Sequence, residues 1–206
     1  MFSVKELVDV SDKLGLIQAV KSKLISQPDL ASSKLIAVLE EVSKIYGALE
    51  QELTRYLSLT LDPTLEPKER AREREALLSL ESGMITARMR EVRGHCGKIY
   101  HIYDRYLSPW FQRVLNPDEV SKMQTLFREL SDIDSYMVDA INEVSRWLAA
   151  EASATLDLVE QGEDAAAQKR VAEARRQVQF ARRQMSKAMF NINDIKGDFI
   201  EQSGAI

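Results

Sequence analysis

The sequence predicts an all-α protein: an up-down-up-down bundle of four long antiparallel helices with an extra amphipathic helix at the N-terminus. Three observations support this fold class. Apolar residues recur in alternating steps of three and four, which is the spacing of one face of a helix. The 206 residues include only eight glycines and five prolines, fewer than the tight turns of an all-β fold would need. The breaks between the apolar stripes are short, and short connections make neighbouring helices antiparallel.

The composition is that of one globular domain spanning residues 1–206. Apolar residues make up 45% and charged residues 29% of the chain, which is ordinary for a soluble protein with a sizeable core. The net charge of −4 provides no general attraction to nucleic acid or to an anionic membrane. A single cysteine excludes an internal disulfide and a zinc site built on paired cysteines. Neither a secretory signal nor a membrane-spanning apolar run is visible, so we expect a cytoplasmic protein.

Residues 4–25 are expected to form the extra helix, and Ser3 with Glu6 fits a capping box at its start. Its apolar face consists of Leu7, Val10, Leu14, Ile17 and Leu24. The first bundle helix is predicted at 30–61, after the connection QPDLASS. Its stripe consists of Leu35, Leu39, Val42, Tyr46, Leu49, Leu53 and Tyr56.

The second bundle helix is predicted at 67–107, with Pro67 at its first position. Its stripe consists of Leu78, Ser82, Ile85, Met89, Val92, Cys96, Ile99, Tyr103, Tyr106 and Trp110. Ser108–Pro109 should break this helix, because the residue before a proline disfavours helical backbone angles. The third helix is predicted at 117–161, with Asn116 as its N-cap. Its stripe consists of Leu126, Leu130, Ile133, Met137, Ala140, Val144 and Trp147.

The last helix, predicted at 164–196, has the most regular stripe. It consists of Ala167, Val171, Ala174, Val178, Ala181, Met185, Ala188, Ile192 and Ile195. Its alanines recur every seven residues, which lets a partner helix approach closely along the whole length. Gly162 should end the preceding helix, Asp164 should cap this one, and Gly197 should end it. The seven-residue period also predicts shallow, left-handed helix crossings.

The segment GHCGKIYHIYDRYLSPWF (94–111) contains the only cysteine and both histidines. The spacing favours a core role, because Cys96 and Trp110 continue the apolar stripe. His95 and His101 lie about 120° apart around a helix and cannot chelate one ion. The chain also lacks the Glu-x-x-His pattern of a di-iron bundle. Cys96 and its neighbouring histidine point about 100° apart, so they do not form a nucleophile–base pair.

No glycine-rich phosphate loop or nucleophile-elbow pattern is present. We therefore expect a protein that is not an enzyme and needs no cofactor or metal ion. Nucleic-acid binding is not expected either, because no helix-turn-helix or base-stacking platform is recognisable. An enzyme or ligand carrier with a pocket around Tyr103, Tyr106 and Trp110 is an alternative hypothesis, which predicts a co-purifying small molecule.

Seven basic residues and one acid lie between positions 168 and 187 of the last helix. Four arginines flank the apolar stripe at seven-residue spacing: Arg175, Arg176, Arg182 and Arg183. One interpretation is pairing within the bundle, with Asp132, Asp139 and Glu143 of the preceding helix as partners. The other is a docking face for an acidic protein, a phosphate-bearing ligand or a membrane surface.

The preferred functional hypothesis is a non-enzymatic interaction or scaffold module. It would bind an acidic surface of another protein through those four arginines, and self-association into a homodimer is left open. The alternative is a pore-forming or membrane-permeabilising domain whose N-terminal helix detaches and inserts. That helix mixes lysines with acids and lacks a basic, aromatic-rich face, so a lid packed on the bundle is the favoured interpretation.

Overall fold

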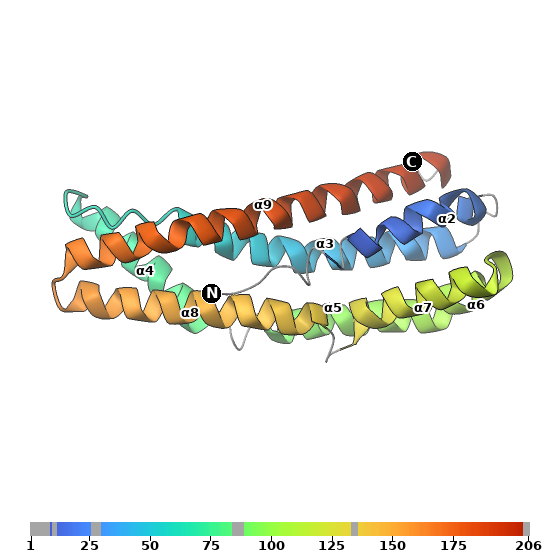
Figure 1. Ribbon diagram of the computed structural model, residues 1–206, viewed down its shortest axis with the longest axis horizontal. Coiled ribbons are helices and arrows are strands. Elements are labelled where there is room, and N and C mark those ends of the chain that lie inside the picture. The colour runs from blue at the N-terminus through green and yellow to red at the C-terminus, as the bar shows by residue number, and fades with distance from the viewer. Residues whose placement is uncertain (1–8, 10–11, 26–29, 84–88, 133–135, 204–206) are drawn as a thin grey trace.

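The computed structural model is all-α (Figure 1). It describes residues 9, 12–25, 30–83, 89–132 and 136–203, and this part of the chain contains no strand. The helices are α2 (Gly15–Ile25), α3 (Leu30–Leu57), α4 (Pro67–Gly83), α5 (Met89–Ile102), the π-helix η2 (Tyr103–Leu107), α6 (Ser108–Val114), α7 (Pro117–Ser131), α8 (Tyr136–Glu160) and α9 (Asp164–Ser203).

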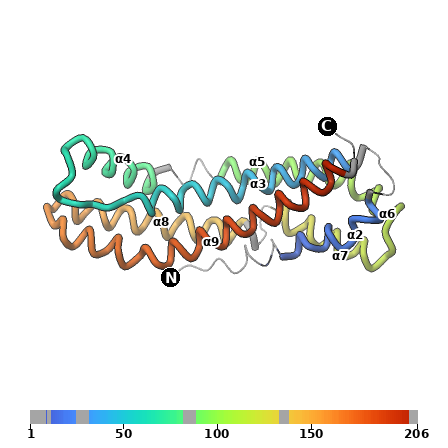
Figure 2. Tube along the Cα trace, turned by 90° about the horizontal axis from the view of Figure 1, so that it is seen from above, coloured from blue at the N-terminus to red at the C-terminus, as the bar shows by residue number. Residues whose placement is uncertain are grey.

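The helices lie lengthwise in an elongated molecule (Figures 1 and 2). The most extensive contact joins α3 to α9. Helix α8 packs on α4 at one end, and α7 packs on α5 at the other, where α2 contacts both α7 and α9. One continuous set of buried side chains runs through all these contacts.

The predicted stripes of α3 and α9 form the centre of this core. All seven predicted residues of α3 are buried, and so are all those of α9 except Ala174, which is half-buried. Alanine on α9 alternates with larger residues, so the two helices pack closely over most of their length. These two predictions are confirmed.

The extra N-terminal helix is confirmed at α2, whereas residues 1–8 and 10–11, including the expected cap of Ser3 and Glu6, lie outside the described residues. Leu14, directly before α2, and Ile17 and Leu24 within it are completely buried. Three ion pairs fasten this segment to the bundle: Lys13–Glu129 (2.7 Å), Lys21–Asp198 (2.6 Å) and Lys23–Glu119 (2.5 Å).

The stripe predicted for 67–107 is only partly correct. Leu78 is 39% exposed, whereas Leu77 and Leu80 are buried. Helix α4 packs on α8, and it turns a different face inward from the one that the single stripe required. The side chains of Ser82 and Ile85 lie outside the described residues.

The predicted helix break at Ser108–Pro109 is wrong. The π-helix η2 leads directly into α6, and the Ser108 N–H donates to the Tyr103 carbonyl five residues back. Pro109 therefore stands in the first two positions of a new α segment, where a missing N–H costs no helical hydrogen bond. The chain leaves the helix only at Leu115, which is extended.

A single helix over 117–161 is also wrong. The predicted cap is confirmed, since Asn116 and Glu119 form a reciprocal capping box at the start of α7. However, α7 ends at Ser131, and Asp132 has extended backbone angles. The Ser131 hydroxyl donates to the Phe127 carbonyl at 2.6 Å, a local bond that competes with regular helix hydrogen bonding and bends helices.

Of four further helix ends, one agrees with the prediction and three differ from it. Gly162, with φ of +76°, ends α8 as predicted. Gly197 does not end α9, because Phe199 is completely buried and extends the apolar stripe beyond it. Asp164 is the first residue of α9 rather than its cap. Helix α3 ends at Leu57, four residues before the predicted end.

Candidate functional site

Two of the four predicted arginines make polar contacts with helix α3. Arg175 donates to the Leu57 carbonyl at the C-terminal end of α3, a position where basic side chains satisfy free helix carbonyls. Arg182 pairs with Glu50 of α3, with 3.3 Å between Nε and Oε1. Both side chains therefore help to hold α9 against α3.

The ion pairs of α9 do not go to the acids that the sequence suggested. The partners described for its arginines belong to α3 and to the middle of α8, where Glu151 pairs with Arg170 at 2.9 Å. The expected partners were Asp132, Asp139 and Glu143. The expectation failed because α9 makes its most extensive contact with α3, not with α8, the helix that precedes it in the chain.

The other two predicted arginines, Arg176 and Arg183, face away from the bundle. Both are exposed, and neither side chain forms a hydrogen bond or an ion pair with any residue that the structure describes. The preceding turn of α9 carries Lys169 and Glu173, which pair weakly with one another at 3.8 Å.

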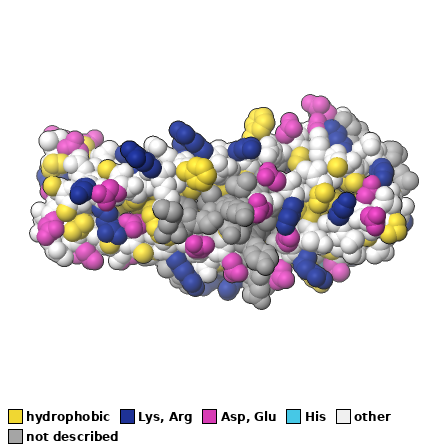
Figure 3. Space-filling model, in the orientation of Figure 1, with side chains coloured by type: hydrophobic (Ala, Val, Ile, Leu, Met, Phe, Trp, Pro, Cys, Tyr) yellow, Lys and Arg dark blue, Asp and Glu magenta, His cyan; other side chains and the backbone are white. Residues whose placement is uncertain are grey.

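Two phenylalanines share this outward face with the unpaired cations. Phe180 is 58% and Phe190 is 70% exposed. We define the outer strip of α9 as Arg176, Phe180, Arg183, Lys187 and Phe190. These residues follow one another in steps of four, three, four and three, so they form a single line about 21 Å long on one helix face. In Figure 3, hydrophobic and basic side chains alternate along the edge formed by α9.

The outer strip combines the chemistry of a protein interface. Arginine and aromatic residues are enriched in interfaces, where they supply planar hydrogen-bond donors and large apolar contact areas. Large hydrophobic side chains exposed in the described chain are Leu78, Tyr100, Phe180 and Phe190. Half of them therefore lie on this one strip.

The predicted apolar stripe of residues 94–111 lies in the core at Cys96, Ile99 and Trp110, whereas Tyr103 and Tyr106 are only partly buried. Cys96 is completely buried and Trp110 is 1% exposed. Burial raises the pKa of the Cys96 thiol from 9.0 to about 11, which is the opposite of the shift that activates a nucleophile.

The histidine next to that cysteine belongs to an ion-pair cluster between α3 and α5. His95 Nδ1 lies 2.5 Å from Glu41 Oε2, and the ammonium groups of Lys44 and Lys98 lie 2.7 and 3.4 Å from the same carboxylate. Burial would raise the pKa of Glu41, but the hydrogen bonds and charges of Lys44 and His95 outweigh it and lower the pKa from 4.5 to about 2. The cluster thus joins two helices.

The cluster does not have the composition of a metal site. Among the residues that the structure describes, no group of three or more histidine, cysteine, aspartate or glutamate side chains could hold a metal ion. The described helices also include none that is long and apolar enough to cross a membrane.

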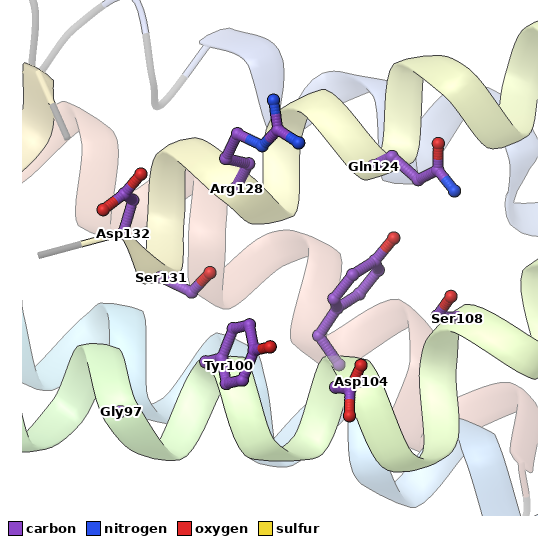
Figure 4. A pocket seen from close by; sticks show the side chains of 9 residues that line it. Gly97, Tyr100, Asp104, Ser108, Gln124, Arg128, Ser131 and Asp132 are labelled. Atoms are coloured by element: carbon purple, nitrogen blue, oxygen red, sulfur yellow. The ribbon is translucent and has the colours of Figure 1, made fainter. Parts of the chain in front are cut away.

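The structure separates the three aromatic residues of the ligand-pocket hypothesis. Trp110 is in the core, while Tyr106 receives the Lys34 ammonium over its ring at 5.0 Å. Tyr103 lines a cavity together with Tyr100, which the hypothesis did not include (Figure 4).

Comparison with protein-family models, curated proteins and solved structures found no match to this chain. The site is therefore defined by its own geometry. The sequence hypothesis missed Phe180, Lys187 and Phe190 as members of the outer strip. A helical projection centred on the face opposite the alanine-containing stripe would have found them.

Proposed function

We propose that this protein is a non-enzymatic interaction or scaffold module, an up-down-up-down bundle that binds an acidic surface of another protein through the outer strip of α9. The observation that carries the proposal is the line of unpaired cations and exposed phenylalanines. The proposal narrows the predicted set of four arginines to Arg176 and Arg183, and it retains the expected cytoplasmic location.

The outer strip suits binding because its backbone is already ordered. Helix α9 is 40 residues long, and its opposite face is buried along α3. Binding of a partner would therefore cost little conformational entropy, because the main chain of this surface is already ordered. Burying one exposed phenylalanine is worth roughly 1.5–3 kcal/mol, and acidic side chains opposite Arg176 and Arg183 would add specificity and faster association.

An acidic protein fits the strip better than a membrane does. The two phenylalanines are ten residues apart, about 15 Å, with cations between them, so no continuous apolar face is available for insertion. The alternative that α2 detaches and inserts has a further cost. It would break three ion pairs and expose Leu14, Ile17 and Leu24 to water.

The test compares a charge reversal on the outer strip of α9 with a matched charge reversal on α5. Protein carrying Arg176→Glu and Arg183→Glu is compared with wild type as bait in cross-linking pull-downs from cell extract. The matched control is Arg90→Glu with Arg93→Glu, because those arginines are also exposed and lie on α5. We expect the outer-strip variant to lose its captured partner, the control to retain it, and both to unfold at the wild-type temperature.

Phe180→Ala with Phe190→Ala should weaken the same capture without changing any charge. Sedimentation velocity of the wild type and the reversed variant tests whether the partner is a second copy of this chain. Liposome leakage that requires residues 1–25 would favour the membrane alternative. Capture that survives both the charge reversal and the phenylalanine truncation would contradict the proposal.

A further inference from the structure

Helices α8 and α9 form one long face of the molecule. They contact one another, and Figures 1 and 2 show them side by side with α4 behind them. In Figure 3, which has the orientation of Figure 1, basic and hydrophobic side chains follow α9, and acidic side chains lie below them along α8. The exposed charged residues on this part of α8 include Asp139, Glu143 and Arg146. The face therefore has a basic edge on α9 and an acidic edge on α8.

The charges of the two edges are not paired with one another inside the chain. The side chains of Asp139, Glu143 and Arg146 form no hydrogen bond or ion pair with any residue that the structure describes. The same holds for Arg176 and Arg183 of the outer strip. Opposite charges thus lie on one face of the molecule, and the fold leaves both sets available to a second molecule.

The two edges match in position along the helices. Arg170 of α9 pairs with Glu151 of α8 at 2.9 Å, so these two residues lie at the same level of the antiparallel pair. Beyond them both helices rise by about 1.5 Å per residue, α9 toward higher numbers and α8 toward lower numbers. Arg183 therefore lies within about 1.5 Å of the level of Asp139.

A two-fold axis parallel to α8 and α9 brings the two edges together between two copies of the chain. Such an axis places α9 of one copy on α8 of the other, and the same contact is made twice. Rotation about it leaves every position along the helices unchanged, so residues that are level within one chain are also level between the copies. An axis across the helices would instead place α9 on α9 and bring like charges together.

The order of charges agrees with the parallel axis. Arg176 lies within about 3 Å of the level of Glu143, and the exposed acid Glu173 lies within about 3 Å of the level of Arg146. The one acid on this part of α9 therefore meets the one arginine of the α8 edge. These offsets are shorter than one helical turn of about 5.4 Å, so the long side chains can span them.

The same arrangement covers an exposed ring. Phe180, which is 58% exposed, lies level with the midpoint between Asp139 and Glu143. In the dimer α8 of the second copy would lie over this ring and remove its apolar surface from water. Charge and apolar burial therefore favour the same contact.

We propose that the outer strip of α9 binds the acidic edge of α8 in a second copy of this chain, which makes the protein a two-fold symmetric dimer. This inference rests on the proposed function of the outer strip and identifies the acidic surface that it binds.

Sedimentation velocity of the full chain at up to about 100 μM tests the inference. We expect the wild type to sediment as a dimer. Two variants, Arg176→Glu with Arg183→Glu and Asp139→Lys with Glu143→Lys, should each dimerise at least about a hundredfold more weakly, because each places like charges opposite one another.

Mixing the two variants is the decisive measurement. In the mixed dimer, the reversed α9 of one chain meets the reversed α8 of the other, and the two unchanged edges meet in the second contact. Both contacts then join opposite charges, so the mixture should recover a dimer although neither variant forms one alone. The matched control is Arg90→Glu with Arg93→Glu on α5, which should dimerise as the wild type does, and circular dichroism verifies that each variant is folded.

Three results would overturn the inference: a monomeric wild type, either reversed variant dimerising as the wild type does, or a mixture that remains monomeric. The pull-down described above separates this failure from that of the proposed function. If Arg176→Glu with Arg183→Glu still loses a captured protein, the outer strip binds a different acidic partner, and only the dimer is wrong.

Discussion

The α3–α9 pair and the α5–η2–α6–α7 end of the bundle are packed in different ways. In the first region, two continuous helices of 28 and 40 residues meet along alternating small and large side chains. In the second, shorter elements surround a cluster of aromatic rings that includes Tyr103, Trp110, Phe111 and Phe127. The first region is a close-packed seam, whereas the second contains a π-helix and a cavity.

The comparison shows how side-chain size determines where a helical bundle can hold a site. Alanine at every other contact lets backbones approach and leaves no room for a ligand. At the aromatic end, large rings fill the core, and a cavity lies beside them between α7 and the α5–η2 segment. One protein can therefore have a close-packed contact between one pair of helices and a cavity between another pair.

The largest effect is expected from Phe127→Ala, because this ring contacts both Tyr103 and Phe111 and is completely buried. Truncating a buried phenylalanine costs about 3–5 kcal/mol of unfolding free energy. Urea denaturation measures this loss. A loss below about 1 kcal/mol would mean that the aromatic end tolerates a void and is not held by this stack.

Overpacking the seam should have the next largest effect. Ala181→Leu adds volume where α9 is completely buried and should lower the unfolding free energy by about 2 kcal/mol. The control is Ala172→Leu on the exposed face of the same helix, which should change it by less than about 0.5 kcal/mol. Equal effects of the two substitutions would show that the seam is not close-packed.

The ion-pair cluster joins the two regions, and Glu41→Gln should lower the unfolding free energy by about 1–2 kcal/mol at pH 7. The pKa of Glu41 is lower in the folded protein than its ordinary value of 4.5, at about 2. Its stabilisation is therefore complete above about pH 4.5 and is lost as the pH falls toward 2.

The measurement is urea denaturation of wild type and Glu41→Gln between pH 7 and pH 2.5. The difference between them should shrink across that window. Glu40→Gln, an exposed neighbour on α3, is the control and should follow the wild type throughout. A difference for Glu41→Gln that stays constant with pH would rule out ionisation of this carboxylate as its source.

The smallest expected effect is a difference in unfolding free energy between substitutions at two consecutive arginines of α9. Arg182→Ala removes the pair with Glu50 and should cost about 0.5 kcal/mol, since partly exposed ion pairs contribute little. Arg183→Ala should leave the unfolding free energy unchanged within about 0.2 kcal/mol. Thermal unfolding of both variants under identical conditions measures the difference, and a larger loss for Arg183→Ala would mean that this residue supports the fold.

The buried stripes of α3 and α9 and the cap of α7 could be predicted from the sequence because they depend on local periodicity and on neighbours three or four residues apart. The burial of Cys96 followed for the same reason. The continuation of the helix through Pro109 could not be predicted, since it depends on a π turn with a hydrogen bond from Ser108 to Tyr103. The sequence placed the candidate site on the last helix and treated its four arginines as one group, whereas two of them, Arg175 and Arg182, contact α3.

The sequence by itself determined that the chain is helical and which faces of its most regular helices are buried, because those properties arise from a 3.6-residue period along one segment. Only the tertiary structure decided that Arg175 and Arg182 bind α3 while Arg176 and Arg183 remain available. It also brought Tyr100 of α5 and Arg128 of α7 to one cavity. These outcomes depend on which helices, distant in the chain, pack against one another and in what orientation. The spacing of residues within one helix carries no information about such contacts.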